Sequence, residues 1–456
     1  MQAVLISTYE LGRQPFGLAS PAASLREAGA DVVCLDLAVQ RLDEDAVSAA
    51  DLVAFYVPMH TATRIATPLL PRVKKLNPAA HICFYGLYAP MNEAYLRDLG
   101  AETILGGEFE PGLVSLARRL RAEGPGTGAA QPEPVISLDK HRFSVPDRSF
   151  LPPLRKYARL ELGGGSSRTV GYVEASRGCK HLCRHCPVVP VYGGAFRVVQ
   201  QEVVLEDIRR QVAAGAEHVT FGDPDFFNGV GHSLPLVRAL HAEHPQLTYD
   251  VTIKVEHLLK HSRPLDELRE TGCLFVTTAV ESIDDRVLAL LDKGHTRGDF
   301  IEVVRLCREA GLLLNPTFVA FTPWITVAGY QELLETIAHL DLIDHVAPVQ
   351  LAIRLLIPAG SKLLELPEVR ELVGEFEQAA LVHPWAHPEP EVDRLQARIQ
   401  RLIQDATGRG ETRREIFSRV WEESSGWPGA SPLALPDAGP RADRASIPYL
   451  TEPWYC

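Results

Sequence analysis

Residues 177–187 have the sequence RGCKHLCRHCP and directly follow the apolar run GYVEAS. Cys179, Cys183 and Cys186 in this stretch have the spacing C-x3-C-x2-C. Three thiolates so close in the chain can converge on one metal site only if the backbone wraps around it, and Gly178 eases such a loop. Thiolates are the soft ligands that iron–sulfur clusters take. Three of them suit a cluster that leaves one iron open for a cofactor.

A structural zinc site is the alternative interpretation of these cysteines. Zinc takes four ligands, and His181 or His185 could supply the fourth. Structural zinc sites usually combine two distant pairs of ligands, whereas these residues all lie in one loop. The pattern favours an iron–sulfur cluster, and a non-catalytic zinc or iron–sulfur binding protein stays open as a second hypothesis.

Strand and helix patterns alternate after the cysteine loop. Between about residues 170 and 365, six apolar runs typical of strands alternate with amphipathic helical patterns. This alternation predicts a partial (β/α)6 barrel, in which the chemistry lies at the carboxyl ends of the strands. The cysteine loop follows the first of these strands and is therefore expected at the mouth of the barrel.

The segments on either side of the barrel have different compositions. Short apolar runs alternate with helical patterns in the first 120 residues, which predicts a doubly wound, flavodoxin-like α/β domain. Such sheets bind ligands beyond the carboxyl ends of their strands. The predicted order is an α/β domain at 1–120, a Pro- and Gly-rich linker at 121–153, the partial barrel at 154–365, and a helical region with an irregular tail at 366–456.

Composition excludes several classes of protein. The chain has 456 residues, of which 46% are hydrophobic and 23% charged, as in a folded globular protein. The net charge of -12 argues against nucleic acid as the main partner. We find neither an apolar stretch of the ~18 residues that a membrane span requires nor a signal peptide. These features predict a cytoplasmic protein without a membrane span.

The cysteine spacing after the first barrel strand resembles that of the radical S-adenosylmethionine (SAM) superfamily. The resemblance implies that Cys179, Cys183 and Cys186 bind a [4Fe-4S] cluster and that SAM chelates its open iron. One electron then cleaves SAM and starts radical chemistry, so the cofactors carry the difficult step. His185 stands where the family usually has an aromatic residue. The expected partners are a small-molecule or peptide substrate and an electron donor such as flavodoxin or ferredoxin.

Polar residues end the second, third and fourth barrel strands, where relatives of this family bind SAM. The predicted SAM contacts are Gly222, Asp223, Lys254, Glu256, Glu281 and Ser282. Asp223 is the candidate for the methionine amine, and Glu281 for the ribose or the amine. Each of these residues could instead be a solvated or salt-bridged strand end.

The order of α/β domain, linker and barrel resembles the B12-binding branch of the superfamily. In that branch glycine-rich loops hold the corrin and its nucleotide tail, and the matching residues here are Gly17, Gly86, Gly106, Gly107 and Glu108. The D-x-H-x-x-G motif, whose histidine ligates cobalt in many B12 proteins, is absent, as is common in the radical branch. The domain is therefore expected either to bind cobalamin, which suits methyl transfer, or to be flavodoxin-like without a corrin.

The last residues, YLTEPWYC, resemble the end of a radical SAM group named for its CUAEP or CCAEP tail. The resemblance implies that the protein continues past Cys456 through selenocysteine or cysteine. An RNA-modifying methylthiotransferase-like enzyme is a further alternative, because it shares the radical barrel. The acidic charge, the single cysteine cluster and the lack of a basic C-terminal domain count against it.

Overall fold

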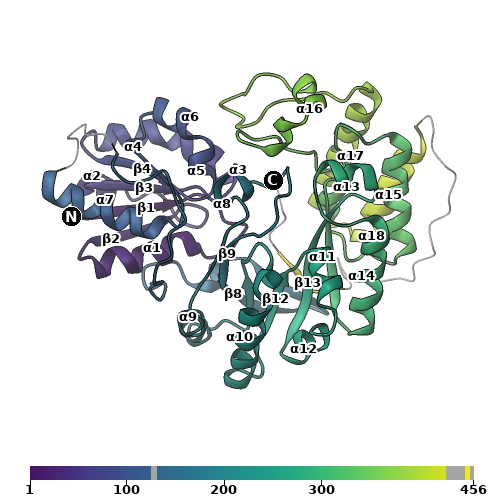
Figure 1. Cartoon of the computed structure of the whole chain (residues 1–456), viewed down its shortest axis with the longest axis horizontal. Helices are drawn as coiled ribbons and strands as arrows, with labels where there is room; N and C mark the ends of the chain where they lie inside the picture. Colours follow the sequence, from purple (N-terminus) through teal and green to yellow (C-terminus); the bar gives the residue numbers. More distant parts are fainter. Residues whose placement is uncertain (125–130, 428–446, 452–456) are drawn as a thin grey trace.

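The computed structural model describes residues 1–124, 131–427 and 447–451. Two α/β units lie side by side, and the C-terminal helices pack on the barrel unit (Figure 1). Of the predicted tail YLTEPWYC, residues 449–451 are described, while residues 452–456, including Cys456, lie outside the described residues. Among the described helices, none is long and apolar enough to cross a membrane.

The N-terminal unit is built on a parallel sheet with the strand order β2-β1-β3-β4-β5-β6. Its strands are β1 (Gln2–Ser7), β2 (Asp31–Asp36), β3 (Leu52–Tyr56), β4 (His81–Tyr85), β5 (Thr103–Gly107) and β6 (Ile136–Ser137). Along β1, Ala3 and Leu5 face one helical layer, and Val4 and Ile6 face the other. Helices cover both faces, which explains why these strands are continuous apolar runs.

The helices of this unit form two layers. One layer contains α1 (Phe16–Glu27) and α7 (Phe109–Glu123), and the other α2 (Glu44–Ala49), α3 (His60–Ala66), η1 (Thr67–Leu69), α4 (Leu70–Leu76), α5 (Tyr88–Met91) and α6 (Glu93–Asp98). Strand order reverses between β1 and β3, so the loops after these two strands diverge. The divergence opens a crevice at the carboxyl edge, where doubly wound sheets bind ligands.

The barrel unit has a sheet with the order β14-β13-β12-β11-β8-β7-β15. Five parallel strands form the barrel, β8 (Ser166–Val173), β11 (His218–Phe221), β12 (Thr248–Thr252), β13 (Cys273–Glu281) and β14 (Leu313–Phe318), and β7 (Arg159–Gly163) and β15 (Tyr449–Leu450) extend it antiparallel. The sixth predicted strand, residues 349–357, begins in the 3-10 helix η4 (Pro348–Leu351) and then forms one parallel bridge between Phe321 and Arg354. Pro348 lacks the N–H that a longer ladder needs, so the sixth strand is reduced to this bridge.

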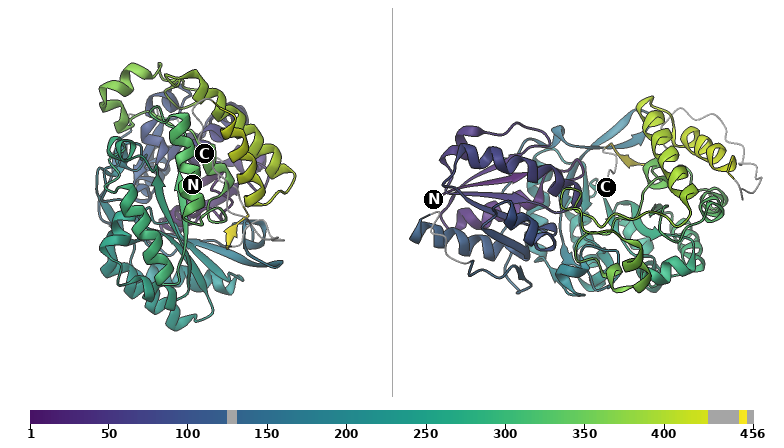
Figure 2. Two further views of the ribbon diagram at one scale, coloured as in Figure 1. Left: turned by 90° about the vertical axis from the view of Figure 1, so that its right-hand side faces the viewer. Right: turned by 90° about the horizontal axis from the view of Figure 1, so that it is seen from above.

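Helices surround the barrel on its outer side and at its open edge. They are α8 (Val189–Tyr192), α9 (Gln201–Ala213), η3 (Phe226–Gly229), α10 (Val230–Glu243), α11 (Val255–Lys260), α12 (Leu265–Glu270), α13 (Asp285–Leu290), α14 (Arg297–Glu309), α15 (Val327–His339), η5 (Lys362–Glu365), α16 (Pro367–Leu372), α17 (Pro390–Gly408) and α18 (Arg413–Ser425). Figure 2 shows that α17 and α18, in yellow-green, lie on the side of the barrel unit away from the N-terminal sheet. The 3-10 helix η2 (Leu154–Lys156) and the hairpin of β9 (Ser176–Gly178) and β10 (Phe196–Val198) complete the unit.

A buried cluster of charges joins the two units. The guanidinium of Arg177, on β9, donates to both carboxylate oxygens of Glu110 at 2.7 and 2.8 Å and to Glu174 at 2.7 Å. Glu108 lies 3.6 Å from the same guanidinium and accepts from the hydroxyl of Tyr192 at 3.1 Å. Because Glu108 and Glu110 belong to the N-terminal unit, this cluster fixes the first barrel loop against the neighbouring domain.

Candidate functional site

The cysteine loop runs from β9 to α8 at the carboxyl end of β8. Gly178 has a φ of 75°, and a Cβ on it would lie 2.4 Å from the ring of Tyr192, so only glycine fits there. Cys179 and Cys183 are buried, and Cys186 is half-buried. Burial, together with the nearby thiolates of Cys183 and Cys179, raises the pKa of Cys186 to about 12. The charges of Cys179 and Cys183 thus reach the Cys186 thiol, and a metal bound to thiolates would reduce their repulsion.

Two buried ammonium groups face these thiols. The Nζ atom of Lys254 lies 3.6 Å from the Sγ atom of Cys183 and 3.6 Å from a carboxylate oxygen of Glu256. Lys293 forms an ion pair of 3.3 Å with Glu281. Burial opposes the charge of Lys293, but Glu281 and the cysteine thiolates raise its pKa above the usual value. Positive charge next to the loop favours the thiolate, which is the form that binds metal.

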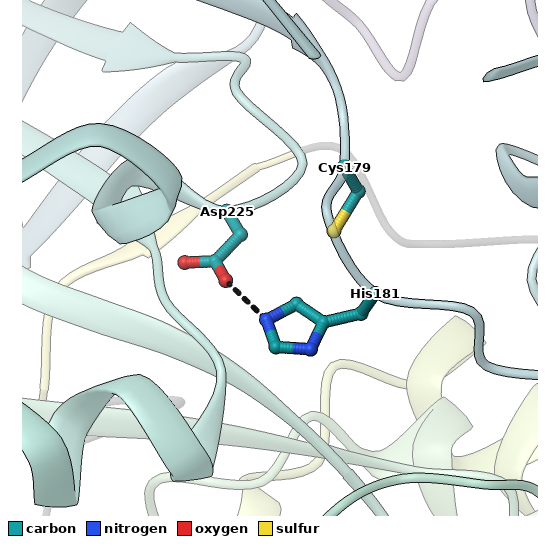
Figure 3. A group of neighbouring side chains, drawn as sticks. All are labelled: Cys179, His181 and Asp225. Atoms are coloured by element: carbon teal, nitrogen blue, oxygen red, sulfur yellow. Dashed lines mark ion pairs between the residues drawn. The ribbon is translucent and has the colours of Figure 1, made fainter. Parts of the chain in front are cut away.

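Carboxylates engage both histidines of the cysteine loop. The Nε2 atom of His181 lies 3.6 Å from Asp225, and its Nδ1 atom lies 3.4 Å from Glu256. Figure 3 shows the imidazole turned toward Asp225, with the sulfur of Cys179 beside them. His185 contacts Glu281 at 3.1 Å. The donor atoms of Cys179, His181 and Asp225 lie within 4.8 Å of one another, a set that could also hold a metal ion. The preference for a three-cysteine cluster therefore rests on the spacing and chemistry of the cysteines.

Glu281 ends β13 and anchors the loop to the barrel. Its φ of 68° is a left-handed conformation that residues other than glycine rarely adopt. Its carboxylate bridges His185 and Lys293 at 3.1 and 3.3 Å. Burial alone would raise the pKa of Glu281, but the charge of Lys293 and the hydrogen bond from His185 lower it to about 2. The predicted cofactor contact is thus a salt-bridged strand end whose partners lie in and beside the cysteine loop.

Asp223 ends β11 and ties it to the end of β8. One carboxylate oxygen accepts from the amide of Ala175 at 2.9 Å and the other from the hydroxyl of Ser176 at 2.5 Å. Burial raises the pKa of Asp223 to about 7. The neighbouring Gly222 has no room for a side chain, because a Cβ would lie 1.8 Å from the hydroxyl of Tyr172. These two residues hold adjacent strand ends together.

The raised pKa of Asp223 predicts a dependence of stability on pH. The folded state keeps this proton up to about pH 7, whereas the unfolded state loses it near 3.8, so stability falls as the pH rises between these values. An Asp223→Asn variant has no ionisable group at this position, so its stability should not fall with pH over this range. Urea unfolding between about pH 4 and pH 8 measures the difference. Asp98→Asn, at an exposed position, serves as the control and should keep the wild-type slope.

The other predicted SAM residues have different surroundings. Glu256 is 41% exposed and is the accessible carboxylate beside the cysteine loop. Ser282 is buried, and its hydroxyl accepts from the amide of Asp284 at 3.1 Å. The structure therefore brings Lys254, Glu256 and Glu281 to the cysteine loop, while Ser282 supports the turn after β13.

The residues predicted to hold cobalamin pack against their own domain or against the charged cluster. They are Gly17, Gly86, Gly106, Gly107 and Glu108. A Cβ on Gly17 would lie 2.1 Å from the ring of Tyr56, and one on Gly106 would lie 2.1 Å from Pro90. A Cβ on Gly107 would meet the Ser137 carbonyl oxygen at 2.2 Å, and one on Gly86 would lie 3.1 Å from the backbone of Val57. The chain's own atoms occupy the positions that side chains would take at the four glycines, and corrin binding by the five residues stays a prediction.

A cavity of about 760 Å³ lies between the crevice of the N-terminal unit and the inner face of the barrel. The N-terminal unit contributes Arg13, His60, Thr61 and Arg64, and the barrel strands contribute Asp250, Phe275, Thr277 and Asn315. The remaining walls come from α17, from β15 and its neighbours, from residues 411–416 at the start of α18, and from the segment 347–356 that contains η4. Asp250 is held by His218 at 2.8 Å and Thr220 at 2.6 Å. The cavity is large enough for a small-molecule substrate.

Sequence reasoning missed Lys293, Asp225 and Arg13. Lys293 follows Glu281 by twelve residues within VESIDDRVLALLDKGHT, and Asp225 lies two residues after Asp223 in FGDPDF. Both residues could have been predicted from the sequence by treating every charged residue that follows a barrel strand as a candidate site residue. Arg13 lies in the loop after the first strand, where a doubly wound sheet is expected to bind ligands, but only the packing of the two units places it at the cavity.

Comparisons with known proteins agree with this geometry. Residues 173–339 match the model of the Radical SAM superfamily. Hopanoid C-3 methylase of Methylococcus capsulatus is 27% identical over 333 residues, which are 68% of this chain and 62% of that enzyme, so the match spans less than two thirds of the relative. The structure of the radical SAM methyltransferase TsrM from Kitasatospora setae with cobalamin and a [4Fe-4S] cluster has a TM-score of 0.58 at 19% identity and covers 75% of this chain and 70% of that one. The cobalamin-dependent SAM radical enzyme OxsB with aqua-cobalamin has a TM-score of 0.66 at 14% identity over 89% of this chain and 67% of that one. The segment 173–339, which contains the cysteine loop and most of the barrel strands, is therefore similar to the Radical SAM superfamily.

Proposed function

We propose that this protein reductively cleaves SAM at a [4Fe-4S] cluster held by Cys179, Cys183 and Cys186, and that the radical acts on a substrate in the cavity between the N-terminal unit and the barrel. The observation that carries the proposal is the convergence of three thiols, faced by Lys254 and Lys293, at the carboxyl end of the barrel strands. When bound, the cluster supplies the electron that breaks a carbon–sulfur bond of SAM.

The surrounding side chains hold the loop and orient the cofactor. Arg177 fixes the start of the loop to the N-terminal unit, and Glu281 fixes its middle through His185. Asp223 and Glu281 are engaged by internal partners, so we assign them a positioning role. Glu256 is the exposed carboxylate at the loop and can accept a hydrogen bond from the SAM amine.

Loss of one cluster ligand tests the proposal. Anaerobic reconstitution of the wild-type chain with iron and sulfide should give a brown protein that converts SAM to 5′-deoxyadenosine and methionine under dithionite. Cys183→Ala should lose the cluster absorbance and the cleavage, because two cysteine ligands do not retain the cluster. Cys307→Ala removes a buried thiol on α14 and should keep both signals. Zinc without iron or sulfide in the wild-type protein would contradict the proposal.

Cobalamin-dependent methyl transfer is the second candidate function. It is favoured by the structural match to OxsB, which covers 89% of this chain, and by the 27% sequence identity to hopanoid C-3 methylase. The proposed corrin contacts are the five residues of the N-terminal unit named from the sequence, Gly17, Gly86, Gly106, Gly107 and Glu108. Purification with hydroxocobalamin tests it, since retained cobalamin and the release of S-adenosylhomocysteine together with 5′-deoxyadenosine would indicate methylation.

We further propose that flavodoxin or ferredoxin supplies the electron. Both are small cytoplasmic proteins, so this donor implies a cytoplasmic enzyme. The direct measurement is to mix reduced flavodoxin with the reconstituted protein and to monitor reduction of the cluster by the change in cluster absorbance.

A further inference from the structure

The charges that line the 760 Å³ cavity are unevenly balanced. Four arginines line it, namely Arg13, Arg64, Arg354 and Arg413, together with the carboxylates of Asp250 and Glu411. Arg354 is paired with Asp393, and Arg413 donates to the carbonyl oxygen of Asp344 at 2.6 Å. Glu411 pairs with Arg409 and Arg419, both at 2.8 Å, and Asp250 accepts from His218. The other two arginines, Arg13 and Arg64, line the end of the cavity that the N-terminal unit forms.

Arg13 and Arg64 form no ion pair with any residue that the structure describes. The guanidinium of Arg13 lies 5.2 Å from the centre of the Tyr172 ring, which holds it at the cavity wall. Its Nε atom is buried without a hydrogen-bond partner among the described residues. A buried donor without a partner destabilises the folded state, and a bound acceptor would satisfy it. Arg64 is exposed on α3 and lines the same end of the cavity.

The rest of the wall is partly apolar and partly amide. Phe275, Val349 and Ile403 contribute apolar surface. Gln396, Gln400 and Gln404 lie four residues apart on α17 and therefore on one face of the helix, and all three line the cavity. Figure 1 shows α17 over the open edge of the barrel. Such a wall suits a substrate with an apolar body and uncharged hydrogen-bonding groups.

We infer that this cavity binds an amphipathic substrate whose anionic group, a carboxylate or a phosphate, is held by Arg13 and Arg64. Guanidinium groups bind both anions through charge-assisted hydrogen bonds. The pair also explains why positive charge gathers here on a chain with a net charge of -12. The inference rests on the proposed function, because it makes this cavity the place where the radical meets its substrate. Cobalamin also carries an anionic phosphodiester, so the experiment must distinguish binding of a substrate anion from binding of cobalamin.

Matched pairs of probes test the inference on the full chain with its reconstituted cluster. The pairs are indole-3-propionate with its amide, octanoate with its amide, and adenosine 5′-monophosphate with adenosine. We expect the wild-type chain to bind the anion of at least one pair about tenfold more tightly than the neutral partner, as measured by calorimetry. Arg13→Gln and Arg64→Gln should each lose this preference, while Arg13→Lys should keep part of it. Arg41→Gln, at an exposed position of the N-terminal unit, is the control and should match the wild type.

Two parallel measurements on the same samples separate the outcomes. Retention of added hydroxocobalamin should be the same in the wild type and both glutamine variants, and any loss of retention would assign the arginines to the cofactor and overturn the inference. Equal binding of every anion and its neutral partner by the wild type would also overturn it, as would an unchanged preference in Arg13→Gln and Arg64→Gln. Cluster absorbance and SAM cleavage report on the proposed function alone, because they need neither arginine.

Discussion

An Arg177→Met variant is expected to lose about 3–5 kcal/mol in free energy of unfolding, the usual effect of removing one partner from a buried ionic cluster. Arg177 is only 7% exposed in its side chain. Without it, the carboxylates of Glu108, Glu110 and Glu174 would stay together in a buried space with no positive charge among them. The variant should also loosen the contact between the two units, because Arg177 and Glu110 lie on opposite sides of it.

Urea unfolding of the chain without its cluster measures this loss. Arg72→Met is the matched control, since Arg72 forms an exposed ion pair with Glu44, and its loss should cost about 1 kcal/mol or less. The carboxylates of the Arg177 variant take up protons more readily than those of the wild type, so the deficit should shrink from about pH 8 to about pH 5. Equal stability of the Arg177 and Arg72 variants at about pH 8 would show that the cluster does not hold the units together.

The cysteine loop and the architecture were accessible from sequence because both depend on local patterns. The spacing of Cys179, Cys183 and Cys186 restricts the ligand chemistry, and the alternation of strands and helices restricts the fold. The sixth barrel strand shows the limit of that approach. Residues 349–357, VQLAIRLLI, have the apolar pattern of a strand. In the structure they form only one bridge, between Arg354 and Phe321, after the proline at position 348.

The glycines and strand-end carboxylates show why much of the site was less accessible. A glycine at position 17 can make room for a ligand or for a side chain of its own domain, and only the fold shows that Tyr56 occupies the space. Glu281 was predicted as a cofactor contact or a salt-bridged strand end. The structure shows its contacts with His185 and Lys293, and the contact between residues 281 and 185 spans a separation that no sequence motif encodes. A contact of Glu281 with the cofactor stays a prediction.

A Glu281→Gln variant is expected to lose about 3 kcal/mol in free energy of unfolding and to incorporate less iron. The substitution removes the carboxylate that pairs with Lys293, whose ammonium group would stay buried without that charge. It also weakens the contact with His185, which lies between Cys183 and Cys186. The loop would then hold its thiols less firmly in the positions that bind the cluster. Urea unfolding of the chain without its cluster and iron analysis after reconstitution measure the two effects.

The dependence on pH distinguishes a lost ion pair from a general packing defect. Because the pKa of Glu281 is lowered from 4.5 to about 2, its contribution is fully present above about pH 4.5 and is lost as the pH falls toward 2. The difference between the wild type and Glu281→Gln should shrink over that window. Glu365→Gln removes an exposed pair with Lys362 and should change stability by less than about 1 kcal/mol at any pH. A deficit of constant size from about pH 6 to about pH 3 would assign the loss to packing, and the anchoring of the cysteine loop by Glu281 would then have to be abandoned.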